Sequence, residues 1–181
     1  MRRLLALCAA LLAIVMTLTA CGDDSTKSTE PHNKADVTFA QHMIPHHEQA
    51  VQMSDIILGK QGIDPRVVNL ANEIKAAQGP EIQQMQSWLS QWGEPTTAAA
   101  SHHSMPGMVP DQAMAALRDA QGAEASKLFL NNMIGHHKGA IAMAQDEIKS
   151  GQYPPAVAMA HSIVTSQQKE ITDLQGLLAS L

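Results

Sequence analysis

The sequence predicts an all-α protein, a four-helix bundle built from two copies of one helical hairpin. Residues 39–58 (FAQHMIPHHEQAVQMSDIIL) recur ninety positions later as residues 129–148 (FLNNMIGHHKGAIAMAQDEI). Residues 70–89 recur as residues 159–178, so both helices of the hairpin are repeated. Aromatic residues make up only 3% of the chain and no β-branched alternation occurs, which argues against strands. Two hairpins joined by a longer crossover are typical of a four-helix bundle.

The N-terminus has the features of a lipoprotein leader. Two arginines precede an apolar run over residues 4–18, and the motif LTAC at residues 18–21 has the pattern of a bacterial lipoprotein cleavage box. These features predict a signal peptide over residues 1–20 and a lipid on Cys21. A transmembrane anchor is the alternative, but the apolar run is shorter than the span of about 20 residues that a bilayer requires. We therefore expect an exported protein, held by its lipid at the outer face of the cytoplasmic membrane or on the periplasmic side.

The mature chain is acidic and lacks useful thiols. Removing the 20-residue leader with its two arginines lowers the basic count from 12 to 10 against 17 acidic residues, a net charge of about −7. An acidic surface argues against nucleic acid as a partner. Cys8 leaves with the leader and Cys21 carries the lipid. Disulfides and thiolate metal sites are therefore excluded, and nothing in the sequence identifies a protein partner.

The first hairpin is predicted over residues 36–92, after a polar, flexible tether at residues 21–35. Its first helix spans residues 36–58, because apolar residues and a histidine recur there at helical spacing. Its second helix spans residues 65–92, starting at an Asp-Pro pair that suits a helix N-terminus. Two features predict distortions: Pro45 opposite Gly135 of the second copy, just before each histidine pair, and an interruption at Gly79-Pro80.

The linker and the second hairpin follow. The linker (93–123) contains a short helix at residues 111–120, and the second hairpin (124–181) consists of helices at residues 124–149 and 156–180. The linker also carries a small His/Met cluster: His102, His103, Met105 and Met108. This cluster is a second candidate site for a soft metal ion. The alternative is a polar loop without a ligand.

The duplicated stretch concentrates histidine and methionine on the buried helix faces. The candidate metal ligands are His46, His47, His136 and His137, with Met43, Met53, Met133 and Met143 above and below them. Imidazole and thioether groups without cysteine suit copper, especially Cu(I), and Ag(I) or Zn²⁺ are the alternatives. His42 precedes the first pair by one turn, but its counterpart is Asn132. The two half-sites are therefore not equivalent.

A metal-free core is the competing interpretation of the same residues. Buried methionine often serves only as packing. Buried histidines need polar partners, and the second and fourth helices offer Gln78, Glu81, Gln167 and Glu170. With a metal bound, these four side chains would instead orient the imidazole ligands from behind.

No catalytic residue is predicted. A di-iron site needs Glu-x-x-His pairs, and no glutamate stands three residues before any histidine here. Glu147 replaces Ile57 of the first copy, which is thin support for an inward carboxylate. Nucleophile-elbow, phosphate-loop and dinucleotide motifs are missing from the sequence. A metal oxidase and a metal-free structural or interaction module remain as alternatives to metal binding.

Three segments resemble one known family. MIPHHEQA (43–50), MPGM (105–108) and MIGHHKGA (133–140) are similar to the bacterial exported family called domain of unknown function 305, and the resemblance covers about residues 36–181. It implies a ferritin-like four-helix bundle, and some members are periplasmic copper-binding proteins linked to metal tolerance. It also implies metal roles for the four paired histidines, with Met43 and Met133 as neighbours, and it implies no catalytic activity. We therefore expect a lipid-anchored protein that sequesters copper in the cell envelope.

Overall fold

The protein is all-helical wherever the computed structural model describes it, over residues 31–96 and 105–181. Within these ranges it has five helices and no strand: α1 (Lys34–Leu58), α2 (Pro65–Trp92), α3 (Asp111–Asp119), α4 (Gly122–Ser150) and α5 (Pro154–Ala179). The predicted all-α class is confirmed. The leader, Cys21, His102 and His103 lie outside the described residues.

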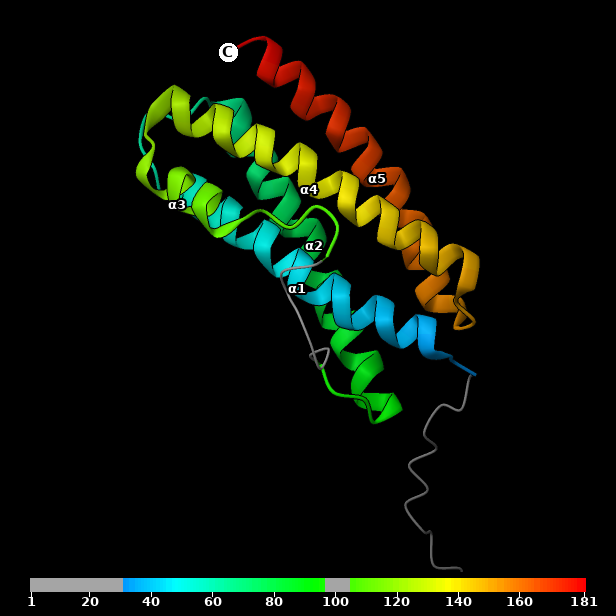
Figure 1. Ribbon diagram of the computed structural model, residues 1–181. Helices are drawn as coiled ribbons and strands as arrows, with labels where there is room; N and C mark the ends of the chain where they lie inside the picture. Colours follow the sequence, from blue (N-terminus) through cyan, green and yellow to red (C-terminus); the bar gives the residue numbers. More distant parts are fainter. Residues whose placement is uncertain (1–30, 97–104) are drawn as a thin grey trace, which may run out of the picture.

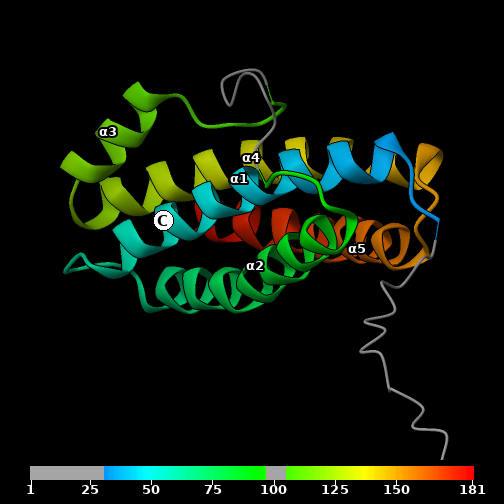
Figure 2. The same ribbon diagram turned by 90° about the horizontal axis from the view of Figure 1, so that it is seen from below.

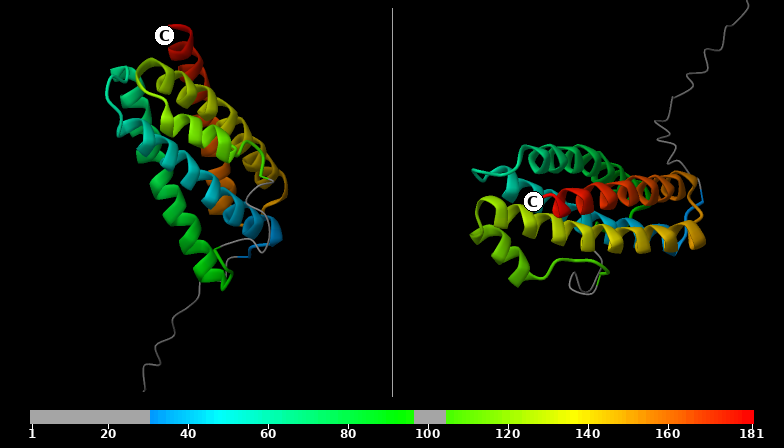
Figure 3. Two further views of the ribbon diagram at one scale, coloured as in Figure 1. Left: turned by 60° about the vertical axis from the view of Figure 1, so that its left-hand side comes forward. Right: turned by 90° about the horizontal axis from the view of Figure 1, so that it is seen from above.

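The bundle consists of two hairpins that meet along α1 and α4. The most extensive contacts join α1 to α2 and α4 to α5, followed by α1 to α4, whereas α2 and α5 touch little. In Figure 1, α1 lies beside α4. Figure 2 shows α2 and α5 on one side of this pair and α3 on the other. The C-terminal end of α5 lies beside the α1–α2 turn (Figure 3), where Arg66 Nη1 donates to Ser180 Oγ over 3.0 Å.

The start of α1 fixes how the hairpins join. Asn33 Oδ1 accepts from the backbone N–H of Ala35 at 2.7 Å, and Asp36 Oδ2 accepts from the Asn33 N–H at 2.6 Å. This reciprocal cap begins α1 at Lys34, two residues before the predicted start. Asp36 Oδ1 also accepts from the backbone N–H groups of Gln152 and Tyr153, at 3.0 and 2.9 Å. One buried carboxylate therefore joins the α4–α5 turn to the start of α1, which makes α1 and α4 antiparallel.

The predicted interruption of the second helix is wrong. The helix α2 continues through Gly79 and Pro80 to Trp92. In the same way α1 continues through Pro45, and α4 continues through Gly135. A proline removes one backbone hydrogen bond, but the flanking turns stay helical because each is packed against a neighbouring helix.

The core is divided into two apolar clusters by a polar layer. On α1, cluster residues 39–44 precede the histidine pair and cluster residues 50–57 follow it. On α4 the order is reversed, so that residues 125–133 belong to the second cluster and residues 140–144 to the first. The paired histidines therefore occupy the middle layer of the bundle. None of the described helices combines the length and apolar character needed to cross a membrane.

Candidate metal site

The centre of the site is a pair of facing histidines, one from each copy of the repeat. His46 on α1 and His136 on α4 have ring centroids 3.7 Å apart and ring planes inclined by 32°. Both side chains are buried, with 0% and 1% of their surface exposed. The antiparallel contact of α1 with α4 thus brings each histidine against its own counterpart in the duplication.

The other two histidines turn outward toward the second helix of their own hairpin. His47 Nε2 lies 2.7 Å from Glu81 Oε2 on α2, and His137 Nε2 lies 2.6 Å from Glu170 Oε2 on α5. Because a carboxylate can only accept, each Nε2 carries the proton and donates it. In the neutral form of each ring the lone pair is therefore on Nδ1. This is the arrangement by which carboxylates orient histidine ligands in metal proteins.

The polar layer holds more unpaired nitrogens than hydrogen bonds can account for. His46 Nε2 donates to the Pro106 carbonyl oxygen at 3.1 Å. Among the described residues, no hydrogen bond of acceptable geometry reaches Nδ1 of His46, His47 and His137 or either ring nitrogen of His136, although the His46 backbone lies close enough to the His136 ring to oppose the lowering of its pKa. A buried polar group without a partner costs roughly 1–3 kcal/mol. Five such nitrogens in one layer indicate a site that is completed by a ligand.

Burial keeps the facing pair neutral. It lowers the pKa of His46 to about 3, helped by the neighbouring His47 ring and opposed by the Pro106 carbonyl. The pKa of His136 is also well below its ordinary value, first because of burial and then because of the surrounding imidazoles. Both rings therefore offer a lone pair at neutral pH. A cation that binds there displaces no proton.

A short strap formed by residues 105–109 closes over the facing pair. Gly107 has φ +79° and packs so closely on Gly139 that a side chain on either residue would overlap the backbone of the other segment. Gln49 fixes the far end of the strap, because its side chain donates to the Val109 carbonyl at 2.9 Å and accepts from the Val109 N–H at 2.8 Å. This closure was not predicted from the sequence, although the glycines in the MPGM and GHHKG motifs are its signal.

The predicted thioethers flank the polar layer on both sides. Met43, Met143 and the strap residue Met105 belong to the first apolar cluster, with Met108 packed against it. Met53 and Met133 belong to the second cluster. Each side of the facing pair thus has one methionine from α1 and one from α4.

The predicted carboxamides stand one helical turn before the two glutamates that contact the histidines. Gln78 and Gln167 are buried, and neither Gln78 side-chain atom nor Gln167 Oε1 has a hydrogen-bond partner in the described ranges. Hydrogen bonding within the protein therefore accounts for one nitrogen each of His46, His47 and His137, and it leaves His136 and Gln78 without partners. A self-satisfied polar core explains only part of this layer.

The histidines do not form a complete metal site by themselves. Within residues 31–96 and 105–181, no three His, Cys, Asp or Glu side chains are grouped so that they could hold a metal ion. The structure brings together two of the four predicted histidines, and it directs the other two toward glutamates. The facing histidines and the methionines on either side of them together offer imidazole and thioether groups. Such a donor set suits a soft ion of low coordination number.

Comparisons with known proteins agree with this architecture. The family model described as domain of unknown function (DUF305) matches residues 36–178. A DUF305 fragment from Deinococcus radiodurans is 33% identical, with a TM-score of 0.77 over 83% of this chain and 99% of that one. A DUF305 protein of Streptomyces coelicolor, predicted to be secreted, is 33% identical, with a TM-score of 0.76 over 81% of this chain and 91% of that one. A comparison with curated proteins found no match.

A third similar structure contains a metal ion. It is CopM in its Cu(I)-bound form, 29% identical, with a TM-score of 0.69 over 80% of this chain and 96% of that one. CopM structures with Cu(II) and with silver bound are similar to this chain as well. Binding of a soft metal ion is therefore compatible with this fold.

Proposed function

The chain belongs to the DUF305 family, and from that premise we propose that it is an exported, lipid-anchored protein that binds copper and sequesters it in the cell envelope. One observation carries the proposal: two neutral, buried imidazoles face each other with unpaired nitrogens between two sets of thioethers. Sequestration follows from burial, because an ion held in this layer is kept away from water, thiols and redox cycling.

The donor set favours Cu(I). Thioether sulfur is a soft, neutral ligand, and imidazole binds Cu(I), Cu(II) and Zn²⁺. Without a thiolate or a grouped set of carboxylates among the described residues, hard ions have little to bind. Silver is a close analogue of Cu(I), and CopM, which is similar in fold, has structures in Cu(I)-bound and in silver-bound form. Zn²⁺ is the weaker alternative.

Helix geometry separates the methionines into two sets. Met43 and Met133 stand one turn before His46 and His136 on the same helices, so their side chains lie over the same face. Met53 and Met143 lie two turns beyond these histidines, about 10 Å away along the helix axis. Because α1 and α4 are antiparallel, Met143 of α4 lies on the same side of the histidines as Met43 of α1, and Met53 of α1 lies on the same side as Met133 of α4. The candidate ion positions are therefore one beside Met43 and Met143 and one beside Met53 and Met133.

The proposal includes three supporting parts. Glu81 and Glu170 orient His47 and His137, and Gln78 and Gln167 stand one turn before these glutamates on α2 and α5. The linker cluster, with Met105 and Met108 on the strap and His102 and His103 before it, is a second place of metal capture. Cys21 carries the lipid, so Cys21→Ser is expected to move the protein from the membrane fraction to the soluble fraction.

A competitive Cu(I) titration of paired variants tests the core site. We expect His46→Ala/His136→Ala to weaken Cu(I) binding by at least about 100-fold, since it removes both facing nitrogens. The matched control is His42→Ala/His161→Ala, which removes two histidines outside the facing pair and is expected to leave the affinity unchanged. Circular dichroism checks that both variants stay helical. Unchanged affinity in the first variant would move the site to the linker cluster.

The metal-free module is the second candidate, because His47 and His137 already have glutamate partners without any ion. A ligand that binds only the folded state must raise its stability. Unchanged thermal stability in excess Cu(I), Ag(I) and Zn²⁺ would support the metal-free module. A metal oxidase differs from both, because it would consume oxygen when Cu(I) or Fe(II) is added.

A further inference from the structure

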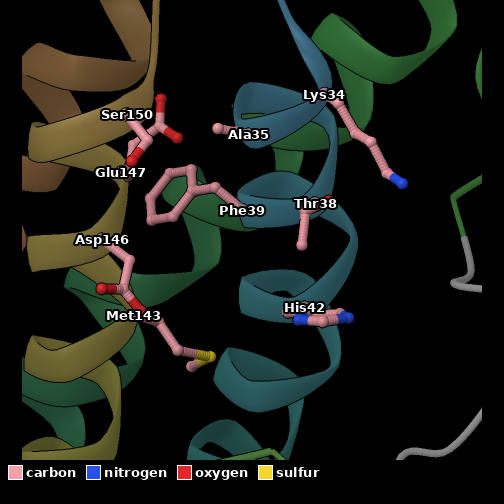
Figure 4. A pocket seen from close by; sticks show the side chains of 9 residues that line it. All are labelled: Lys34, Ala35, Thr38, Phe39, His42, Met143, Asp146, Glu147 and Ser150. Atoms are coloured by element: carbon pink, nitrogen blue, oxygen red, sulfur yellow. The ribbon is translucent and has the colours of Figure 1, made fainter.

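A cavity lies at the end of the bundle away from α3. It has a volume of about 370 Å³ and opens between the first turns of α1 and the last turns of α4 (Figure 4). Its walls are largely apolar and include Phe39, Met143 and Ala35, whereas Glu147, Asp146 and His42 contribute its polar groups. The volume is within the range of small-molecule sites, which are typically apolar with a few polar groups.

Glu147 is the unusual group in this cavity. Only 2% of its surface is exposed, and neither carboxylate oxygen has a hydrogen-bond donor among the described residues. The neighbouring carboxylate, Asp36, already accepts from the N–H groups of Asn33, Gln152 and Tyr153. Two carboxylates can be joined only through a shared proton. Burial, followed by the proximity of Asp36, accordingly raises the pKa of Glu147 to about 8.

The duplication provides an internal reference for this cavity. At the offset of ninety residues, Glu147 corresponds to Ile57, Asp146 to Ile56 and Thr38 to Leu128. At that end the three hydrocarbon side chains belong to, or pack against, an apolar cluster that α3 covers with Met114 and Leu117. At the Ile57 end the position is thus packed with hydrocarbon and covered by α3, whereas at the Glu147 end it is acidic and open to a cavity. Core packing alone does not explain a glutamate at position 147.

We propose that this cavity binds a small organic ammonium ion, with its apolar body between Phe39 and Met143 and its charged group against Glu147. The charge follows from three acidic groups in or beside the cavity, those of Asp36, Asp146 and Glu147, of which Glu147 releases its proton to solvent when the cation binds. The Lys34 ammonium group at the rim extends away from them in Figure 4. The ring of Phe39 adds an attractive face for a cation.

An organic ion fits better than a metal ion. The cavity is far larger than a single ion requires, and its walls are mainly hydrocarbon. The described residues also contain no grouping of three carboxylates and histidines that could coordinate a metal here. Met143 belongs both to this cavity and to the proposed copper site, but the charged anchor of the cavity, Glu147, is not among the groups proposed to hold copper.

The test compares benzylammonium with benzyl alcohol, which has nearly the same shape but no charge. Binding is followed by NMR shift changes of residues around Phe39 and Glu147 at pH 8.5, where Glu147 is ionised in most molecules and benzylammonium is still protonated. The wild-type protein is expected to bind benzylammonium roughly tenfold tighter than benzyl alcohol, the preference that one charge-assisted hydrogen bond provides. Glu147→Gln is expected to abolish this preference at nearly unchanged shape.

Three further variants make the outcome decisive. Glu147→Ile copies the residue found at the other end and is expected to fold and to lose ammonium binding. Glu124→Gln, the same chemical change at an exposed site on α4, should keep the preference. His46→Ala/His136→Ala should keep it too, which separates this site from the copper proposal. Equal binding of both probes, a preference that survives in Glu147→Gln, or no shift changes near Phe39 would each overturn the inference.

Discussion

The two halves of the bundle agree at its centre and differ at its ends. At the centre His46 faces its counterpart His136, and the His47–Glu81 contact of 2.7 Å is repeated as His137–Glu170 at 2.6 Å. At the ends Ile57 of the first half is replaced by Glu147 of the second. The duplicated halves have thus kept the same polar contacts only where both contribute to one layer.

This difference distinguishes residues that are explained by core packing from residues that need a chemical role. An apolar residue in a core is explained by burial alone, whereas a buried polar group lowers stability unless it is paired. The central layer nevertheless holds four buried histidines, and the contact of His47 with Glu81 recurs as that of His137 with Glu170, although only His46 also donates to Pro106. We interpret the centre as the part of the molecule that performs the common function and the ends as parts free to acquire their own.

A substitution under the strap is expected to have the largest effect on the central layer. Gly139→Ala places a methyl group against the backbone of Pro106 and Gly107, neither of which can yield as a side chain would. We expect a loss of roughly 2–4 kcal/mol in the free energy of unfolding, together with weaker Cu(I) binding. Urea denaturation and metal titration measure the two effects. Wild-type values for both would show that the strap does not close over the site.

The pH dependence of stability is the next largest effect, and it belongs to one end only. The pKa of Glu147 is raised from its ordinary 4.5 to about 8 in the folded protein. The folded state therefore retains this proton, and the stability that it contributes is present below about pH 4.5 and is lost as the pH rises toward 8. Urea denaturation between pH 5 and 9 should show wild type losing about 1–3 kcal/mol relative to Glu147→Gln. Parallel curves would contradict the raised pKa.

The paired glutamates sharpen the comparison at the centre. Glu81→Gln and Glu170→Gln each replace a charged acceptor by a neutral one, so each should cost about 1 kcal/mol of stability and roughly tenfold in Cu(I) affinity. Because the two contacts are equivalent, the two losses should agree within experimental error. Isothermal calorimetry and thermal unfolding measure them. A large inequality would show that only one half serves the site.

The smallest expected effect is a gain. Gly135 lies inside α4, and nothing lies within 4 Å of the position of an added methyl group. Gly135→Ala should therefore raise the free energy of unfolding by roughly 0.5–1 kcal/mol, because alanine loses less backbone freedom in a helix. It is also the matched control for Gly139→Ala on the same helix. A destabilised Gly135→Ala would mean that the backbone before His136 needs glycine.

Periodicity and duplication predicted the helices because they report local structure. The bounds differ by about two residues at the starts of α1, α4 and α5, of which only α1 begins at a side-chain cap. The buried position of all four histidines was predictable for the same reason. Their orientation was not, since the antiparallel contact of α1 with α4 depends on tertiary contacts such as Asp36 with the α4–α5 turn.

The remaining features of the site involve groups that carry no sequence pattern. The Pro106 carbonyl that accepts from His46 is a backbone atom, and the strap contact depends on what Gly107 and Gly139 lack. In the sequence, the only sign of the cavity beside Glu147 is the replacement of Ile57 by a glutamate in the second copy of the repeat. Side-chain chemistry can be predicted from sequence, whereas closure and access follow from how the hairpins are joined.

The most direct test of the copper site is the X-ray absorption spectrum of the Cu(I)-loaded protein, compared with that of His46→Ala/His136→Ala. We predict that the wild-type protein shows both nitrogen and sulfur neighbours around copper, and that the variant loses the nitrogen contribution. Copper surrounded by light atoms alone, or a spectrum that the double substitution leaves unchanged, would contradict a site made of the facing histidines and the flanking methionines.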